Sequence, residues 1–216
     1  DDLIVDVADP RRLSVLERAA LLKRIRHANM ALYRSPVTSP DKSLPRQLGA
    51  QLGLHRLDAN WLADEDGISR ITVADAKGAQ GEAAAAYIPY TDRAIQWHTD
   101  GYYHPQQRRI HGMILHCVQP AREGGETTLM DHEMAYIALR DADPRWMRAL
   151  MADDAMTIPA RLGETGEARA AQSGPVFSVD ADSGALHMRY TARTRSIEWR
   201  SDACTREAVA FLRELL

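Results

Sequence analysis

Short apolar segments separated by turn residues fill the middle of the chain, and they restrict its fold more than any other feature. Strands are expected at residues 85–90, 94–98, 109–118 and 126–130, and again within 155–160, 174–180 and 184–192. The stretch VDADSGA, which joins the last two, is typical of a hairpin turn. Many short strands with turn signals predict a mainly β fold with flanking helices around a jelly-roll-like core.

Helical spacing appears near both ends of the chain and once between the strands. Ser14 and Glu17 form a capping box at the start of a helix expected over residues 14–34. Pro144 has the place of a first helical residue. Further helices are expected at 44–54, on both sides of Pro144 within 131–154, and at about 205–216. We therefore expect a helical N-terminal part over 1–60 within a single domain covering 1–216.

The composition excludes several classes of protein. Twenty-seven basic and thirty acidic residues give a net charge of -3, so no nucleic-acid partner is expected. No apolar run reaches membrane-spanning length, and the two cysteines form neither a disulfide framework nor a paired zinc motif. We expect a cytoplasmic protein without a membrane partner, and a homo-oligomer is compatible with the sequence. Because FLRELL ends on an apolar helical stripe, the domain is expected to lack its C-terminal strands.

The stretch IQWHTDGYYH carries the strongest chemical signal. In a strand, residues i and i+2 point to the same face, so His98 and Asp100 would project together while Thr99 turns away. An imidazole beside a carboxylate supplies two ligands of the 2-His-1-carboxylate triad that holds Fe(II). Gly101 follows and lets the chain turn without crowding the site. The alternative is a hydrogen-bonded surface pair without a metal.

Two later segments favour the metal interpretation. The apolar segment RRIHGMILHCVQP is followed by AREGGETTLMD, in which a Gly-Gly turn leads into Thr127 and Thr128. The order WHTD, apolar strand, GGETTLMD resembles the Fe(II)- and 2-oxoglutarate-dependent oxygenases of the taurine dioxygenase type, which include the γ-butyrobetaine hydroxylase branch. The resemblance runs from about Tyr87 to Asp131 and continues more weakly to the final helix, over somewhat more than half of the chain.

The resemblance implies a double-stranded β-helix and a set of residue roles. His98 and Asp100 match the first two iron ligands, and Thr127 matches the threonine that hydrogen-bonds the distal carboxylate of 2-oxoglutarate. Tyr90 matches a pocket tyrosine of the γ-butyrobetaine hydroxylase branch. Such enzymes use O2 to hydroxylate a small-molecule substrate and convert 2-oxoglutarate to succinate and CO2. The protein supplies the ligand geometry and a dry pocket.

The third iron ligand of this family has no counterpart here. The resemblance implies a distal histidine and, within some ten residues, an arginine for 2-oxoglutarate, both on a strand after the helix at 205–216. His187 lies one element too early for that role. Either these residues follow Leu216 in a longer protein, or the iron site has been lost.

Aromatic and basic residues offer candidates for substrate binding. The aromatic residues around the HxD pair are Tyr87, Tyr90, Trp97, Tyr102 and Tyr103. Each is a core or rim residue by default, but Tyr90 and Tyr102 are our candidates for the pocket, where an aromatic set would hold a quaternary ammonium. Three arginines, Arg189, Arg193 and Arg195, are expected at the surface. The alternative for one of them is pairing with an anionic substrate or with 2-oxoglutarate.

Three functions are therefore compatible with the sequence. The first is Fe(II)- and 2-oxoglutarate-dependent hydroxylation of a small molecule, such as an amine, a betaine, a sulfonate or an amino-acid derivative. The second is a non-catalytic jelly-roll protein that binds a ligand and has lost the third iron ligand. The third is a cupin-like metal-dependent hydrolase or isomerase that uses the same His98–Asp100 pair without O2.

Overall fold

The computed structural model describes residues 2–58, 67–73, 88–163, 166–193 and 197–216, without the side chains of 162–168, and all structural statements below concern these residues. Contacts within the chain define two compact units. The first combines Asp1–Ser69 with Gly112–Asp131, and the second combines Arg70–His111 with His132–Leu216. Each unit is described by itself.

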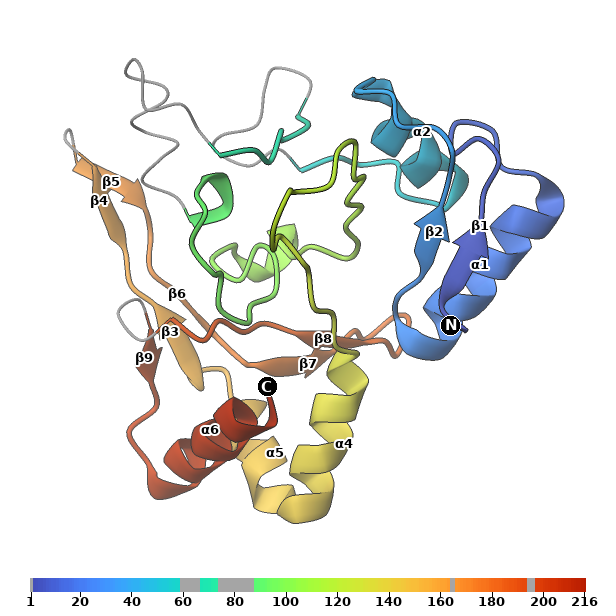
Figure 1. Cartoon of the computed structure of the whole chain (residues 1–216). Coiled ribbons are helices and arrows are strands. Elements are labelled where there is room, and N and C mark those ends of the chain that lie inside the picture. The colour runs from blue at the N-terminus through green and yellow to red at the C-terminus, as the bar shows by residue number, and fades with distance from the viewer. Residues whose placement is uncertain (1, 59–66, 74–87, 164–165, 194–196) are drawn as a thin grey trace. The chain divides into compact units, whose positions relative to one another are not determined.

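The described part of the first unit contains two helices and two short strands (Figure 1): β1 (Ile4–Asp6), α1 (Val15–Ala28), β2 (Leu32–Arg34) and α2 (Ser43–Gln51). The strands pair in parallel, with Ile4 opposite Leu32. Val5 and Val7 pack with Leu21 of α1 in a small buried core. The two predicted helices are therefore present, and the strands between and before them were not predicted.

Helix α1 begins as the sequence predicts and ends earlier. The Ser14 hydroxyl accepts a hydrogen bond from the Glu17 amide at 3.2 Å, and the Glu17 carboxylate accepts one from the Ser14 amide at 2.6 Å. Both halves of the capping box are thus formed. Asn29, in the left-handed conformation at φ 55°, ends the helix. The predicted extension to residue 34 is wrong because the chain then enters β2.

The segment 112–131 completes the first unit without helix or strand. Its apolar side chains include several that are about half exposed: Met113, Leu115, Val118 and Leu129. The strands predicted at 109–118 and 126–130 are wrong for the structure as described. Apolar alternation records a preference for a pleated, half-buried surface, and it produces a strand only where a neighbouring strand completes the hydrogen-bond ladder.

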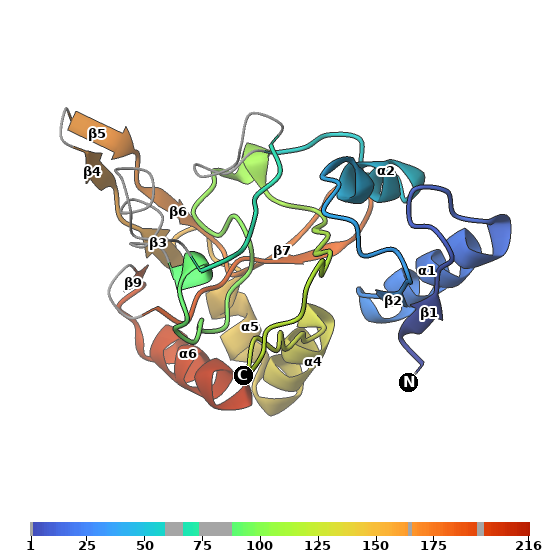
Figure 2. The ribbon, with the colours of Figure 1, turned by 45° about the horizontal axis from the view of Figure 1, so that its top comes forward.

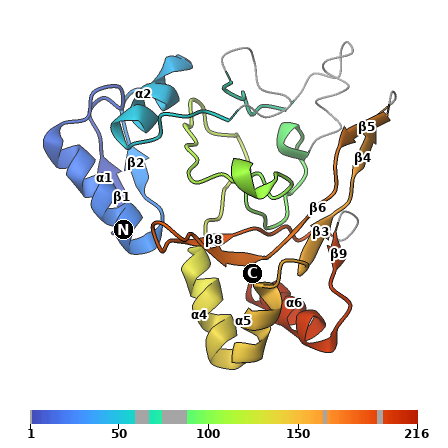
Figure 3. The same cartoon turned by 180° about the vertical axis from the view of Figure 1, so that it is seen from behind.

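In the residues described, the second unit carries three α-helices that pack against one another (Figures 1 and 3), namely α4 (His132–Ala142), α5 (Pro144–Leu150) and α6 (Ala203–Leu215). Pro144 occupies the start of α5, and the Asp143 carboxylate accepts from the Arg145 amide at 2.8 Å. Asp202 caps α6 by accepting from the Thr205 amide at 3.0 Å. The helices predicted around Pro144 and at the end of the chain are confirmed.

Seven short strands accompany these helices: β3 (Met156–Ile158), β4 (Arg161–Gly163), β5 (Gly166–Arg169), β6 (Gln172–Gly174), β7 (Phe177–Val179), β8 (Leu186–Met188) and β9 (Glu198–Trp199). Strand β3 lies between β6 and β9 in an antiparallel sheet. The β4–β5 hairpin continues outward from β3 and β6, as Figure 2 shows. The predicted hairpin between residues 179 and 185 is confirmed as β7–β8, and Gly184 turns the chain at φ 71°.

The strands predicted at 85–90 and 94–98 do not form in the described residues. Residues Ile88–Tyr90 form a 3₁₀ turn, η1, and 85–87 lie outside the described residues. The strand expected at 94–98 is wrong, because only His98 makes a β-bridge, to Thr191. A second 3₁₀ turn, η2, covers Gln106–Arg108. More of the described residues are in α-helices than in strands, and their small sheets do not close into a barrel.

Within the ranges that the structure describes, no helix combines the length and the apolar character that a bilayer crossing requires.

Candidate functional site

The backbone around His98 and Asp100 is held by residues 190–192. The Thr99 amide donates to the Tyr190 carbonyl at 2.9 Å, and the Tyr190 amide donates to the Thr99 hydroxyl at 3.0 Å. The Ala192 amide donates to the Trp97 carbonyl at 2.8 Å. These bonds use the Thr99 side chain. The side chains of His98 and Asp100 take no part in them.

The side chains of His98 and Asp100 approach each other. Nε2 of His98 lies 3.7 Å from Oδ1 of Asp100, and the two side chains are 29% and 45% exposed. Nδ1 of His98 lies 2.8 Å from the Gln96 carbonyl oxygen. Because a carbonyl only accepts, Nδ1 carries a proton, and Nε2 is the ring nitrogen that faces Asp100.

The donor atoms of this pair are suited to two adjacent positions on a metal ion. Metal–ligand bonds of about 2.1 Å at right angles would place two donors about 3 Å apart. A ring nitrogen that faces a carboxylate oxygen is favourable when a proton or a cation lies between them. Among the described residues, no group of three or more His, Cys, Asp or Glu side chains could hold a metal. The pair supplies donor types that suit Fe(II), and its role as two ligands of a larger set stays a prediction.

A tight turn follows the pair, as the glycine in the sequence predicts. Gly101 has a φ of 64°, and the His104 amide donates to its carbonyl at 2.8 Å. A Cβ at position 101 would lie 2.6 Å from Cγ1 of Ile110. The turn thus requires glycine both for its left-handed backbone and for space.

The turn presents a chain of aromatic rings in edge-to-face contact. The Tyr102 and Tyr103 rings meet edge to face at 5.2 Å between centroids, and the Tyr103 and His104 rings at 4.7 Å. The guanidinium of Arg169, from β5, lies 5.5 Å from the centre of the Tyr103 ring. Tyr90 is half-buried at the end of η1, while Tyr87 is outside the described residues. No local sequence pattern indicated Arg169, because it meets Tyr103 only through tertiary structure.

Thr127, the candidate for 2-oxoglutarate binding, belongs to the first unit, whereas His98 and Asp100 belong to the second. It is exposed and follows Gly124 and Gly125, which turn the chain at φ 64° and 80°. A Cβ at Gly125 would lie 2.9 Å from Cβ of Ala121. The predicted Gly-Gly turn is therefore confirmed, and the role of Thr127 stays a prediction.

Two hydrogen bonds attach this segment to the rest of the first unit. Nδ2 of Asn29 donates to Oδ1 of Asp131 at 2.9 Å. The Tyr33 hydroxyl lies 2.6 Å from Nδ1 of His116. Burial raises the pKa of Tyr33 to about 12, with a further contribution from Cys117, and burial also lowers the pKa of His116. Tyr33 is therefore neutral at physiological pH and donates to the imidazole.

A histidine cluster lies beside the β7–β8 hairpin. The His111 and His187 rings are 6.3 Å apart, and Nε2 of His132 lies 2.9 Å from the Leu186 carbonyl oxygen. Burial lowers the pKa of His187 to about 4, and the positive charge of Arg109 and the neighbouring His111 add to this effect. His187 is thus half-buried and neutral at physiological pH, and its exclusion from the metal site stays a prediction.

Arg189 is not the surface residue that the sequence predicts. Its guanidinium donates to four backbone carbonyls, those of Gln172 and Pro175 at 3.3 Å, Gly174 at 3.1 Å and Met156. Burial lowers the pKa of Arg189. These bonds join the sheet of β3 and β6 and leave little donor capacity for a substrate. Arg193 is half-buried, and Arg195 lies outside the described residues.

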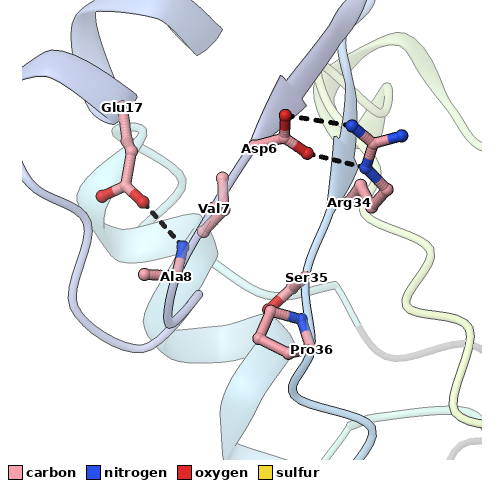
Figure 4. Close-up of a pocket in the computed structure, with 7 residues that line it drawn as sticks. All are labelled: Asp6, Val7, Ala8, Glu17, Arg34, Ser35 and Pro36. Carbon is pink, nitrogen blue, oxygen red and sulfur yellow. Dashed lines mark hydrogen bonds and ion pairs between the residues drawn. The ribbon is translucent and has the colours of Figure 1, made fainter.

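A hollow of about 520 Å³ in the first unit includes none of the predicted site residues (Figure 4). Asp6 and Arg34 pair with each other across it at 2.7 Å, and Glu17 accepts from the Ala8 amide at 2.7 Å. Its charged groups thus have partners within the unit, and we assign no ligand to it.

Comparison with known protein families decides the assignment. Residues 56–216, which include His98, Asp100 and Thr127, match the family described as "Taurine catabolism dioxygenase TauD, TfdA family". The chain belongs to the TauD/TfdA family. The resemblance inferred from the WHTD and GGETTLMD motifs is confirmed. Membership supports a dioxygenase function and implies a jelly-roll fold. The sheets of the described residues do not form the closed barrel of such a fold.

One curated relative extends this assignment. The TauD/TfdA chain is 39% identical over 99 residues to a protein named uridine-5'-phosphate dioxygenase from Amycolatopsis sp. The match covers 44% of the chain and 33% of the relative, so it spans about a third of that protein's length. No solved structure gives a significant match.

Proposed function

We propose that this protein hydroxylates a small molecule in a reaction that depends on Fe(II) and 2-oxoglutarate. The observation that carries the proposal is the approach of His98 Nε2 to Asp100 Oδ1, 3.7 Å apart, in a chain of the TauD/TfdA family. Bound iron would supply the activation of O2 for oxidation of a substrate C–H bond, coupled to conversion of 2-oxoglutarate to succinate and CO2.

The chain's own residues have distinct tasks in this proposal. His98 and Asp100 would hold the metal, and the Gln96 carbonyl would orient the imidazole by keeping the proton on Nδ1. The Gly101 turn would bring Tyr102 next to the pair so that its ring lines the substrate pocket. Thr127 would hold the distal carboxylate of 2-oxoglutarate through its hydroxyl. Tyr90 is proposed as a second pocket residue.

The substrate class proposed is a nucleoside monophosphate. Support comes from the uridine-5'-phosphate dioxygenase of Amycolatopsis sp, which shares 39% identity over 99 residues. Such a substrate carries a dianionic phosphate and a planar base, and these require a cation and an aromatic surface for recognition. The cluster of Tyr102, Tyr103 and Arg169 supplies both types of group.

The test is a coupled assay on the purified protein with Fe(II), 2-oxoglutarate and uridine 5'-phosphate. Oxygen consumption and succinate are measured together with loss of the nucleotide. The proposal expects all three to proceed in equal amounts and to stop when 2-oxoglutarate is omitted. Turnover without O2 and 2-oxoglutarate would instead favour the hydrolase or isomerase alternative. Ligand binding without consumption of either cosubstrate would favour the non-catalytic binding protein.

A further inference from the structure

We propose that Arg169 and Tyr103 form the binding site for the anionic group of the substrate, a phosphate monoester. This inference rests on the proposed function for the identity of the substrate, but the evidence for the site is independent of it. It deepens the proposed function by assigning the phosphate to two residues outside the WHTD and GGETTLMD motifs.

The first argument is the geometry of the two side chains. The Arg169 guanidinium lies 5.5 Å from the centre of the Tyr103 ring, within the range of a cation–π contact. The Tyr103 ring is itself held edge to face by Tyr102 and His104. A stacked guanidinium is preorganised, so it loses less side-chain entropy when it binds an anion.

The second argument is the incomplete pairing of the Arg169 charge. Its Nη2 donates to the Pro159 carbonyl at 2.7 Å. Its Nε is buried and has no hydrogen-bond partner in the described part of the chain, where no carboxylate pairs with this guanidinium either. A buried donor without a partner costs about 1–3 kcal/mol. A phosphate beside this guanidinium would supply the anionic acceptor that it lacks in the described part of the chain.

The contrast with other arginines of the second unit supports this argument. Arg140 pairs with Asp141 at 2.8 Å and Arg145 pairs with Asp143, while Arg109 pairs with Asp180 at 3.4 Å. The Arg189 guanidinium is occupied by four carbonyls. Arg169 differs from these residues because it joins an aromatic cluster and keeps an unpaired donor.

The third argument is the position of Tyr103 beside the candidate metal ligands. Tyr103 follows Asp100 by three residues, and three Cα–Cα steps span at most about 11 Å. The turn closed by the His104 amide and the Gly101 carbonyl shortens this path further. A phosphate at Arg169 and a reacting carbon near His98 and Asp100 are therefore compatible with one substrate of nucleotide size.

The same contact disfavours a quaternary ammonium at Tyr103. The guanidinium already covers this ring, and a second cation beside it would be repelled. The idea that the aromatic set binds a betaine-like cation therefore does not extend to Tyr103. An anion gains from the positive charge at the same place.

The experiment is isothermal titration of the Fe(II)- and 2-oxoglutarate-loaded protein, without oxygen, with uridine 5'-phosphate and with uridine. We expect the phosphorylated ligand to bind at least about tenfold more tightly, as one charge-assisted bidentate contact allows. Arg169→Gln should remove most of this preference and leave the affinity for uridine unchanged. Arg169→Lys keeps the charge but not the paired donors, so it should retain an intermediate preference.

Arg140→Gln is the matched control, since it removes the same charge from an exposed site of the same unit. It should keep the full preference for the phosphorylated ligand. Thermal melting of each variant shows whether it is folded. If Arg169→Gln does not fold, the ligand preference of Arg169→Lys is used for the test. An undiminished preference in a folded Arg169 variant would overturn the inference, as would tighter binding of a trimethylammonium ligand.

This design separates the inference from the proposed function. Arg169-dependent binding of the nucleotide without succinate formation would retain the site and reject the oxygenase activity. Succinate formation, together with a preference for the phosphorylated ligand that does not depend on Arg169, would retain the oxygenase activity and reject the site.

Discussion

Nε2 of His98 lies 3.7 Å from Oδ1 of Asp100, while Nδ1 of the same imidazole is held at 2.8 Å by the Gln96 carbonyl oxygen. An imidazole nitrogen and a carboxylate oxygen thus converge, and both belong to groups that are partly exposed. This arrangement suits a cation that enters from solvent.

Asp100→Ala is expected to reduce iron binding and succinate formation by at least about 100-fold. Loss of the only carboxylate ligand removes a charge from the metal site, and even outer-shell changes cost about 10–100-fold in metal affinity or activity. Metal content and succinate release measure the effect. Asp92→Ala, a change to an exposed aspartate of the same region, should leave both unchanged. Retained succinate formation in Asp100→Ala would contradict the metal assignment.

Thr127→Val is expected to raise the KM for 2-oxoglutarate about tenfold or more, with a smaller change in kcat. The substitution removes one hydrogen bond to a carboxylate, worth about 1.5–3 kcal/mol. Initial rates at varied 2-oxoglutarate concentration measure it. The adjacent exposed Thr128, changed in the same way, is the control and should keep the original KM. Equal effects of the two substitutions would argue against the role of Thr127.

Arg189→Met is expected to lower the free energy of unfolding by about 2–4 kcal/mol, because it leaves backbone carbonyls of β3 and the β6–β7 region without their donor. Urea unfolding measures this change. Arg148→Met, at an exposed position of α5, should change stability by less than about 0.5 kcal/mol. A stable Arg189→Met protein would show that these bonds are replaced by water.

His187 is expected to make the protein less stable in acid. Its pKa is about 4 in the folded state against about 6.5 when unfolded, so protonation favours unfolding. The neutral side chain's contribution is complete above pH 6.5 and is lost as the pH falls toward 4, by at most about 3 kcal/mol. Urea unfolding at pH 7 and pH 4 should therefore show a smaller difference for His187→Gln than for the original protein.

The exposed His27, changed to Gln, is the control and should keep the original difference between the two pH values. If His187→Gln and the original protein lose the same stability between pH 7 and pH 4, groups other than His187 cause the acid sensitivity.

Local sequence determined the elements whose signals act over a few residues. The Ser14–Glu17 capping box, Pro144 at the start of α5, the hairpin at 179–185 and the Gly101 turn all appear as predicted. Each depends on a cap, a fixed φ or a left-handed glycine, and these preferences do not need a distant partner. The approach of His98 to Asp100 follows their spacing of two residues, but distant residues 190–192 hold the backbone between them.

Tertiary structure decided the rest. The apolar alternation in 109–118 produced no strand, because a ladder requires a partner strand that periodicity cannot specify. The placement of Arg189 on four carbonyls and of Arg169 over Tyr103 depends on segments remote in sequence. A charged side chain is expected at the surface because water solvates its charge. Only the fold shows where backbone carbonyls or an aromatic face take the place of water around it.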